Sequence, residues 1–174
     1  MRKGEMLSRA IMIATQAHYG QYDRGGNPYI IHPLTVMHNV GKVSEEIQAI
    51  AVLHDVIEDA AGKTIYMDGK AAEISFKLLH EQGMSTRVIE AVKALTKMPG
   101  QSYEEYQQSV LENKDAMLVK IQDLKTNSDL SRLKSKSASI AEKDKRRVAK
   151  YMAFYSLIDA KLSQQQTKVG DCVL

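Results

Sequence analysis

The sequence predicts an all-α fold of about seven to eight helices. Apolar residues recur with helical spacing through most of the chain, no stretch alternates apolar and polar residues for long, and runs of β-branched residues are short. At 174 residues and 19.5 kDa the chain can bury a core without cross-links, and it fits a single domain over residues 1–174. No internal repeat or long linker in the sequence divides it.

Glycine, proline and serine residues divide the apolar pattern into elements. Pro33 favours the first turn of a helix, Ser44 is a good N-cap, and Ser102 with Glu105 forms a capping box. The glycines and prolines of residues 20–33 indicate an ordered loop. We therefore predict helices over residues 5–19, 33–40, 45–59, 68–82, 85–97, 102–113, 116–127 and 140–165, and a loop over 60–67. The last ten or so residues are expected to be flexible.

Charge balance and cysteine content limit the classes of partner. The 24 Lys and Arg residues against 21 Asp and Glu give a formal net charge of +3, too small to predict nucleic-acid binding but compatible with a phosphorylated small molecule. The single cysteine, Cys172, forms no internal disulfide, so we expect a reducing, cytoplasmic location. Polar residues interrupt the N-terminal apolar positions and exclude a signal peptide or membrane span there. A homo-oligomer is left open.

One predicted core helix ends in a cluster of ionisable residues. Apart from Gln48, residues 47–53 are all apolar, which is typical of a buried helix. Four ionisable residues follow: His54, Asp55, Glu58 and Asp59. In a continuous helix they share one sector, where three carboxylates beside one imidazole repel one another and lose hydration on burial. A bound cation removes both costs; the alternative is a solvated acidic helix end with His54 in the core.

Further candidate ligands lie elsewhere in the chain. Lys120, Asp123 and Asn127 are spaced by three and four, which places them on one helix face. That pattern by itself is also typical of a solvated helix surface. Two imidazoles and two carboxylates form the combined candidate set: His32, His54, Asp55 and Asp123. Nitrogen and oxygen ligands without a thiolate suit Mn²⁺, Fe²⁺ or a similar divalent cation.

These residues resemble the motifs of a known family, the HD-domain metal-dependent phosphohydrolases. The resemblance is carried, in the family's order, by His32-Pro33, His54-Asp55, Glu58-Asp59 and Lys120-Ile-Gln-Asp123 with Asn127. Within the family the chain looks most like the hydrolase domain of the RelA/SpoT-type enzymes. Those enzymes remove pyrophosphate from the 3′ position of guanosine tetra- and pentaphosphate (ppGpp and pppGpp). Long members also carry a synthetase domain, for which this sequence has no room, so the resemblance implies a small stand-alone hydrolase with an HD-domain helical bundle.

The resemblance also implies a metal and its ligands. The family's metal is Mn²⁺, and the residues matching its ligands are His32, His54, Asp55 and Asp123. The expected activity is therefore metal-dependent release of pyrophosphate from a nucleotide.

The other matched residues are expected to act on water or substrate. Glu58 and Asp59 match the family's catalytic acidic pair, with Glu58 carrying the proton and Asp59 positioning the water that attacks phosphorus. Arg24, Lys120 and Asn127 are the candidate substrate-binding residues. For Lys120 two interpretations stay open: it neutralises phosphate charge, or it pairs with an acid of the site.

Two alternative functions stay open, one from departures from the family pattern and one from the basic last helix. In the loop resembling the family's His-x-Gly-Gln-x-Arg pattern, Asp23 replaces the Arg that packs on guanine, and Arg24 follows one place later. The retained metal-site residues with altered neighbours are compatible with an HD phosphohydrolase for another nucleotide or phosphate ester. A second alternative is a catalytically silent module that binds nucleic acid through the basic segment 143–150 of the last helix.

Overall fold

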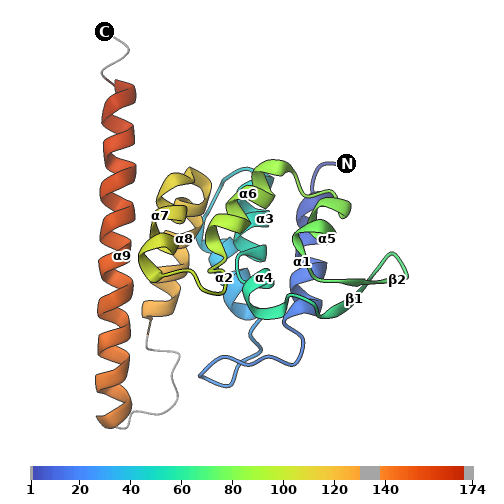
Figure 1. The fold of residues 1–174 in the computed structure, drawn as a ribbon, viewed down its shortest axis with the longest axis horizontal. Helices are drawn as coiled ribbons and strands as arrows, with labels where there is room; N and C mark the ends of the chain where they lie inside the picture. The colour runs from blue at the N-terminus through green and yellow to red at the C-terminus, as the bar shows by residue number, and fades with distance from the viewer. Residues whose placement is uncertain (1, 130–137, 171–174) are drawn as a thin grey trace.

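The computed structural model describes residues 2–129 and 138–170, and most of this part of the chain is helical (Figure 1). In chain order the elements are α1 (Glu5–Ala17), α2 (Ile31–Asn39), α3 (Glu45–Leu53), α4 (Val56–Ala60), β1 (Thr64–Met67), β2 (Lys70–Glu73), α5 (Phe76–Glu81), α6 (Thr86–Leu95), α7 (Tyr103–Glu112), α8 (Lys114–Ser128) and α9 (Ala138–Gly170). The predicted all-α class is confirmed, with one small two-stranded sheet added to it.

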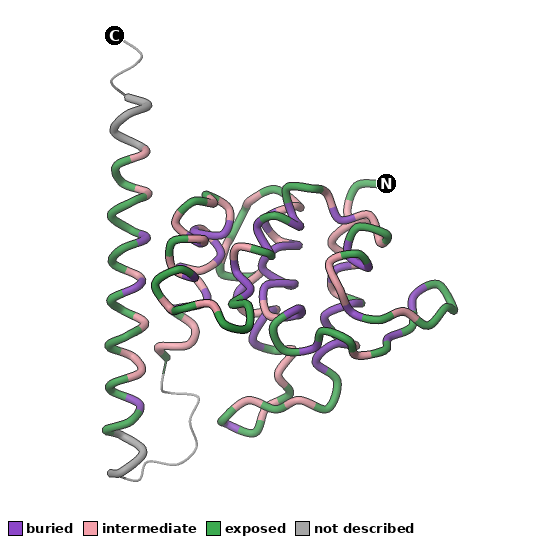
Figure 2. The backbone as a smooth tube through the Cα atoms, viewed as in Figure 1, coloured by how far each residue is buried: buried purple, intermediate pink, exposed green. Residues whose placement is uncertain are grey.

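Helix α3 lies at the centre of the helical bundle, where it contacts α1, α2, α6 and α8 (Figure 1). Its residues 49–53 are fully buried, and they lie among the buried segments in Figure 2. A helix that is apolar on every side is stable only when other elements surround it. Because α3 is surrounded in this way, its C-terminal end places His54 inside the protein.

The caps predicted from the sequence are present. The Ser44 hydroxyl accepts a hydrogen bond from the Ile47 amide at 3.4 Å, and Ser102 and Glu105 form a complete capping box. Helix α2 begins at Ile31, two residues before the predicted start, because the backbone is already helical there. These local signals therefore locate helix starts to within about two residues.

The helix predicted over residues 68–82 is wrong in its first part, and so is the loop predicted over 60–67. The chain instead forms the antiparallel hairpin β1–β2, and α5 begins only after the Ser75 cap. Met67 pairs with Lys70, so the connecting turn consists of two residues.

The turn of this hairpin explains the difference. Its two residues, Asp68 and Gly69, have φ angles of 50° and 77°. Two positive φ angles are what a type I′ hairpin turn requires, and Asp-Gly is among the sequences that adopt it most readily. The turn therefore outweighs the helix propensity of the Lys-Ala-Ala-Glu segment at 70–73.

The single helix predicted over residues 45–59 is broken between α3 and α4. The His54 ring Nδ1 bonds the Ala51 carbonyl oxygen at 2.8 Å. In an uninterrupted helix that carbonyl accepts the backbone N–H of Asp55. The side chain thus takes the place of a helical hydrogen bond, and α3 ends at Leu53 while α4 begins at Val56.

Helix α9 packs along α8 and touches α7 (Figure 1). Phe154 and Ile158 are fully buried, and the Phe154 ring centroid lies 6.1 Å from that of Tyr103 and 6.1 Å from that of Tyr106. The helix continues beyond its predicted end to Gly170. The rest of the predicted flexible tail, with Cys172, lies outside the described residues. No helix in the described ranges is long and apolar enough to cross a membrane.

Candidate metal centre

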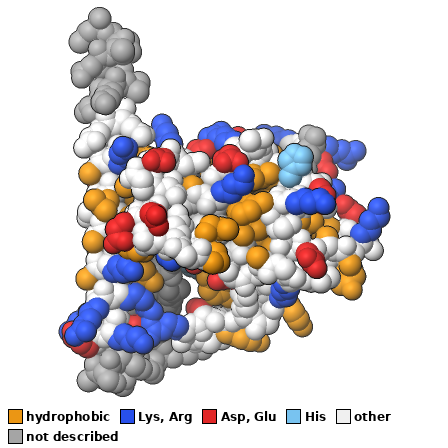
Figure 3. All heavy atoms as spheres, in the orientation of Figure 1, with side chains coloured by type: hydrophobic (Ala, Val, Ile, Leu, Met, Phe, Trp, Pro, Cys, Tyr) orange, Lys and Arg blue, Asp and Glu red, His pale blue; other side chains and the backbone are white. Residues whose placement is uncertain are grey.

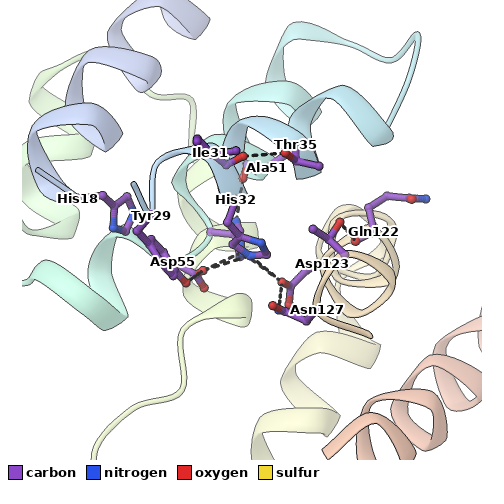
Figure 4. Close-up of polar contacts among 12 residues, drawn as sticks. His18, Tyr29, Ile31, His32, Thr35, Ala51, Asp55, Gln122, Asp123 and Asn127 are labelled. Carbon is purple, nitrogen blue, oxygen red and sulfur yellow. Dashed lines mark hydrogen bonds and ion pairs between the residues drawn. The ribbon is translucent and has the colours of Figure 1, made fainter. Parts of the chain in front are cut away.

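The four predicted ligand residues lie together although they come from three separate segments of the chain. Figure 4 shows three of them, His32, Asp55 and Asp123, pointing toward one another. His32 lies in the first turn of α2, His54 and Asp55 lie at the break between α3 and α4, and Asp123 lies on α8. The shorter imidazole–carboxylate distances are 3.0 Å, for His32 Nε2–Asp123 Oδ1 and His54 Nε2–Asp55 Oδ2. The two crossed distances are 3.6 Å. Each imidazole therefore faces both carboxylates.

The ring nitrogens at the centre of this cluster fit a cation. Nδ1 of His54 takes part in the bond to Ala51, so in the neutral ring the proton lies there and Nε2 carries the lone pair. Nε2 of His54 and Nε2 of His32 are buried without a hydrogen-bond partner, although carboxylate oxygens lie close by. Buried polar atoms without a partner are rare in native proteins. A divalent cation shared with Asp55 and Asp123 would satisfy both.

The charges within the cluster favour protonation of His54, so a proton competes with a cation for this imidazole. Burial lowers the pKa of His54, but the Asp55 and Asp123 carboxylates outweigh it and raise the pKa of His54 to about 10. Burial would raise the pKa of Asp55, but the imidazoles of His54 and His32 hold it well below its usual range. Without a cation, His54 therefore carries a proton at neutral pH, which a cation must displace.

We expect the affinity for Mn²⁺ to fall about tenfold for each unit by which the pH is lowered, as one proton is displaced per ion. The pKa of His54 is raised, so the metal-free ring stays protonated from acid to neutral pH and the trend should show no plateau between about pH 6 and 8. Titration calorimetry in buffers of different ionisation enthalpy measures the released protons directly. Affinity that is independent of pH, with no proton release, would contradict a protonated His54.

Asp123 is held by groups on its own helix as well as by the imidazoles. Lys120 Nζ lies 2.7 Å from Asp123 Oδ2. The Asn127 amide donates to Asp123 Oδ1 at 2.6 Å (Figure 4). Burial would raise the pKa of Asp123, but Lys120 together with the imidazoles of His32 and His54 outweighs it and holds the pKa of that carboxyl well below its usual range. Of the two interpretations of Lys120, the structure shows the pairing with an acid. A direct role of Lys120 or Asn127 in binding substrate stays a prediction.

The predicted acidic pair lies beside the ligands, on the exposed side of α4. Glu58 Oε2 accepts a hydrogen bond from the Lys97 backbone N–H at 2.9 Å, which ties α4 to the end of α6. Partial burial, Asp55 and Glu58 raise the pKa of Asp59 to about 6. Both carboxylates thus reach solvent while the ligand residues His32, His54 and Asp123 are buried.

The structure does not bring Arg24 into the ligand cluster. Its guanidinium lies 2.6 Å from the buried carboxylate of Asp144 on α9. Asp23, at the position of the family's base-packing Arg, accepts backbone N–H bonds from Gly25 and Asn27 at 2.8 Å each. The Asp23 carboxylate therefore stabilises its own loop.

Around Asp144, residues of the loop and of α9 line an open cavity of about 530 Å³ with five cationic side chains. These are Arg24, Lys143, Arg146, Arg147 and Lys150. The same basic side chains gather at the lower end of α9 in Figure 3. Five cations against one carboxylate make this cavity, called here the basic pocket, a region of positive potential.

Two further residues lie next to the candidate ligands, and the sequence predicted no role for Tyr29. The Tyr29 hydroxyl donates a hydrogen bond to Asp55 Oδ2 at 2.7 Å, and burial raises the pKa of Tyr29, so this hydroxyl keeps its proton. His18 is buried, with its Nδ1 2.8 Å from Gln21 Oε1 and its ring centroid 4.9 Å from that of Tyr29. Tyr29 stands three residues before His32, one helical turn away. That spacing is the sequence signal that could have placed its side chain next to the candidate site.

Comparisons with known proteins test the family resemblance. No family model matches the chain. It is 46% identical over 55 residues to a guanosine-3′,5′-bis(diphosphate) 3′-pyrophosphohydrolase of Borreliella burgdorferi, which covers 30% of this chain and 8% of that protein. It is 34% identical over 110 residues to the Haemophilus influenzae protein of the same name, covering 62% of this chain and 14% of that protein. The chain thus spans only a small part of these relatives.

A solved structure shares the fold along nearly the whole chain. It is described as a metazoan ortholog of SpoT that hydrolyses ppGpp, and it superposes with a TM-score of 0.62 at 18% identity. The superposition covers 95% of this chain and 98% of that one. Together with the sequence relatives, it confirms the predicted resemblance to the hydrolase domain of RelA/SpoT-type enzymes.

Proposed function

We propose that this chain is a metal-dependent pyrophosphohydrolase that removes the 3′-pyrophosphate of ppGpp and pppGpp, with Mn²⁺ as the metal and Fe²⁺ as an alternative. The observation that carries the proposal is the convergence of His32, His54, Asp55 and Asp123, in which each imidazole Nε2 lies 3.0 to 3.6 Å from both carboxylates. The names of the sequence relatives support this substrate. Localisation in the cytoplasm and a single domain over residues 1–174 remain part of the same proposal.

The chemistry divides between the buried ligands and the exposed acids. A divalent cation, when bound, lowers the pKa of a water molecule and neutralises phosphate charge. Glu58 would take the proton from the attacking water, and Asp59 would hold that water by a hydrogen bond. With a pKa of about 6, Asp59 is ionised at neutral pH and can accept such a bond. Their exposure on α4 gives both acids access to a substrate that enters from solvent.

The basic pocket supports a substrate that carries several phosphates. The loop of residues 20–30 runs from Arg24, which lines this pocket, to Tyr29, which contacts the metal ligand Asp55. A nucleotide phosphorylated at two positions could therefore lie between a positive region and the metal centre. In this arrangement Arg24 would act on substrate through the charge of the basic pocket rather than by packing on the base.

One observation favours the second candidate function, a phosphohydrolase for another nucleotide or phosphate ester. Position 23 carries a carboxylate in place of a cation that could pack on a guanine. That carboxylate accepts hydrogen bonds from its own loop. Weak selection of the base is the expected consequence.

Incubation of the purified chain with ppGpp and Mn²⁺ is expected to release pyrophosphate and GDP. Chelation of the metal should stop the reaction, and added Mn²⁺ should restore it. A panel with pppGpp, the adenosine analogue of ppGpp and GTP tests the choice of substrate. Cleavage of ppGpp and pppGpp far above the adenosine analogue and GTP would remove the second candidate, and equal cleavage of the adenosine analogue would support it. A protein that binds Mn²⁺ and cleaves none of them would contradict both.

A further inference from the structure

We propose that Tyr29 is a positioning residue that holds the Asp55 carboxylate in the metal centre. The inference rests on the proposed metal-dependent function but concerns the affinity for the cation. Tyr29 and Asp55 lie 26 positions apart in the sequence, and the Tyr29 hydroxyl joins them by a hydrogen bond of 2.7 Å. The bonded oxygen, Oδ2, is also the one that lies 3.0 Å from His54 Nε2 and 3.6 Å from His32 Nε2. Tyr29 therefore acts on the oxygen that faces both imidazoles.

Asp55 lacks the local support that the other polar N-cap residues have. In the described part of the chain, five side chains accept a hydrogen bond from the first turn of the helix that they precede: Ser44, Ser75, Ser85, Ser102 and Asn113. Asp55 precedes α4 but makes no such bond, and its backbone is helical (φ −102°, ψ −6°) where those five are extended. An extended N-cap directs its side chain toward the helix amides. The Asp55 carboxylate thus has no backbone donor from α4 to orient it.

Tyr29 itself is anchored on both sides. Its backbone N–H donates to the Gln21 carbonyl at 2.9 Å, and its carbonyl accepts the His32 N–H at 2.9 Å. Its ring lies between two imidazoles, with centroids 4.9 Å from His18 and 5.6 Å from His32 (Figure 4). A donor with a fixed backbone and a packed ring can hold a carboxylate at one place.

The experiment compares Tyr29→Phe with the unmodified full chain. We expect the Mn²⁺ affinity, measured by calorimetry or by the spin resonance of free Mn²⁺, to fall about ten- to a hundredfold. The thermal midpoint of the metal-free protein should stay close to that of the unmodified chain. Tyr22→Phe is the matched control, because Tyr22 is on the same loop with 68% of its surface exposed, and it should bind Mn²⁺ normally.

The same substitution in a chain that already carries Asp55→Asn tests whether Tyr29 acts by positioning Asp55 or by a general effect on the structure. If Tyr29 acts through Asp55, then Tyr29→Phe should cause little further loss of Mn²⁺ affinity in an Asp55→Asn chain, measured at millimolar Mn²⁺. An equal loss in both backgrounds, or unchanged affinity in Tyr29→Phe alone, would overturn the inference. A chain that shows the expected Tyr29 dependence of Mn²⁺ binding but cleaves no ppGpp would overturn the proposed function and support this inference.

Discussion

Replacing Asp123 by Asn is expected to abolish both Mn²⁺ binding and turnover, and to destabilise the metal-free protein. The Oδ1 atom of Asp123 faces His32 and His54, so the substitution removes one of the two carboxylates that face both imidazoles. Its Oδ2 atom lies 2.7 Å from Lys120, whose side chain is 15% exposed. Removing one partner of a buried ion pair costs about 3–5 kcal/mol. Calorimetry with Mn²⁺ and urea unfolding without metal measure the two effects separately.

Two further variants separate metal binding from stability. The double variant Lys120→Met with Asp123→Asn leaves no buried charge without a partner, so it should regain most of the stability while still failing to bind Mn²⁺. Asp115→Asn is the matched control, because Asp115 lies on the same helix and pairs with Arg87 at 2.6 Å, outside the ligand cluster. It should bind Mn²⁺ normally. Normal Mn²⁺ affinity in Asp123→Asn would remove this residue from the ligand set.

Replacing Glu58 by Gln is expected to leave Mn²⁺ binding unchanged and to lower kcat by about 10²- to 10⁴-fold. In the described part of the chain, Glu58 forms no hydrogen bond or ion pair with the four candidate ligand residues; its carboxylate accepts the Lys97 backbone N–H at 2.9 Å. The amide oxygen of Gln can accept the same bond, so the local structure should persist. What Gln cannot do is accept a proton from water.

Steady-state kinetics with ppGpp and Mn²⁺ titrations measure both quantities for Glu58→Gln. Glu81→Gln serves as control, because Glu81 is an exposed residue of α5, and its kcat should not change. His54→Ala provides the contrast, since it should lose metal and turnover together. Loss of Mn²⁺ binding in Glu58→Gln equal to that in His54→Ala would contradict the division of roles between the acids and the ligands.

Local sequence signals predicted much of the fold. The apolar run of residues 47–53 indicated a buried helix, and α3 is the centre of the core because no other environment suits such a helix. The capping box of Ser102 and Glu105 depends only on residues three positions apart, so it could be recognised directly. The hairpin at 64–73 was missed because the helix was predicted to begin at Asp68, which instead forms the two-residue turn with Gly69.

The candidate site was predictable in its residue types and less so in its contacts. The set of His32, His54, Asp55 and Asp123 follows from spacing and family resemblance, and the structure brings its members together. The break after α3 was not predictable from periodicity. It depends on a bond from the His54 ring to a backbone carbonyl, which competes with the helix itself.

By itself the sequence determined the helical class, the helix caps and the chemical identity of the candidate metal-binding groups, because these depend on residue types and on neighbours within a few positions. Only the tertiary structure decided which distant groups meet. Tyr29 reaches Asp55 across 26 positions, and Arg24 reaches Asp144 across 120. Such contacts depend on how α2, α4, α8 and α9 pack as a whole, since the free energy of that packing is shared among many apolar contacts and belongs to no local segment.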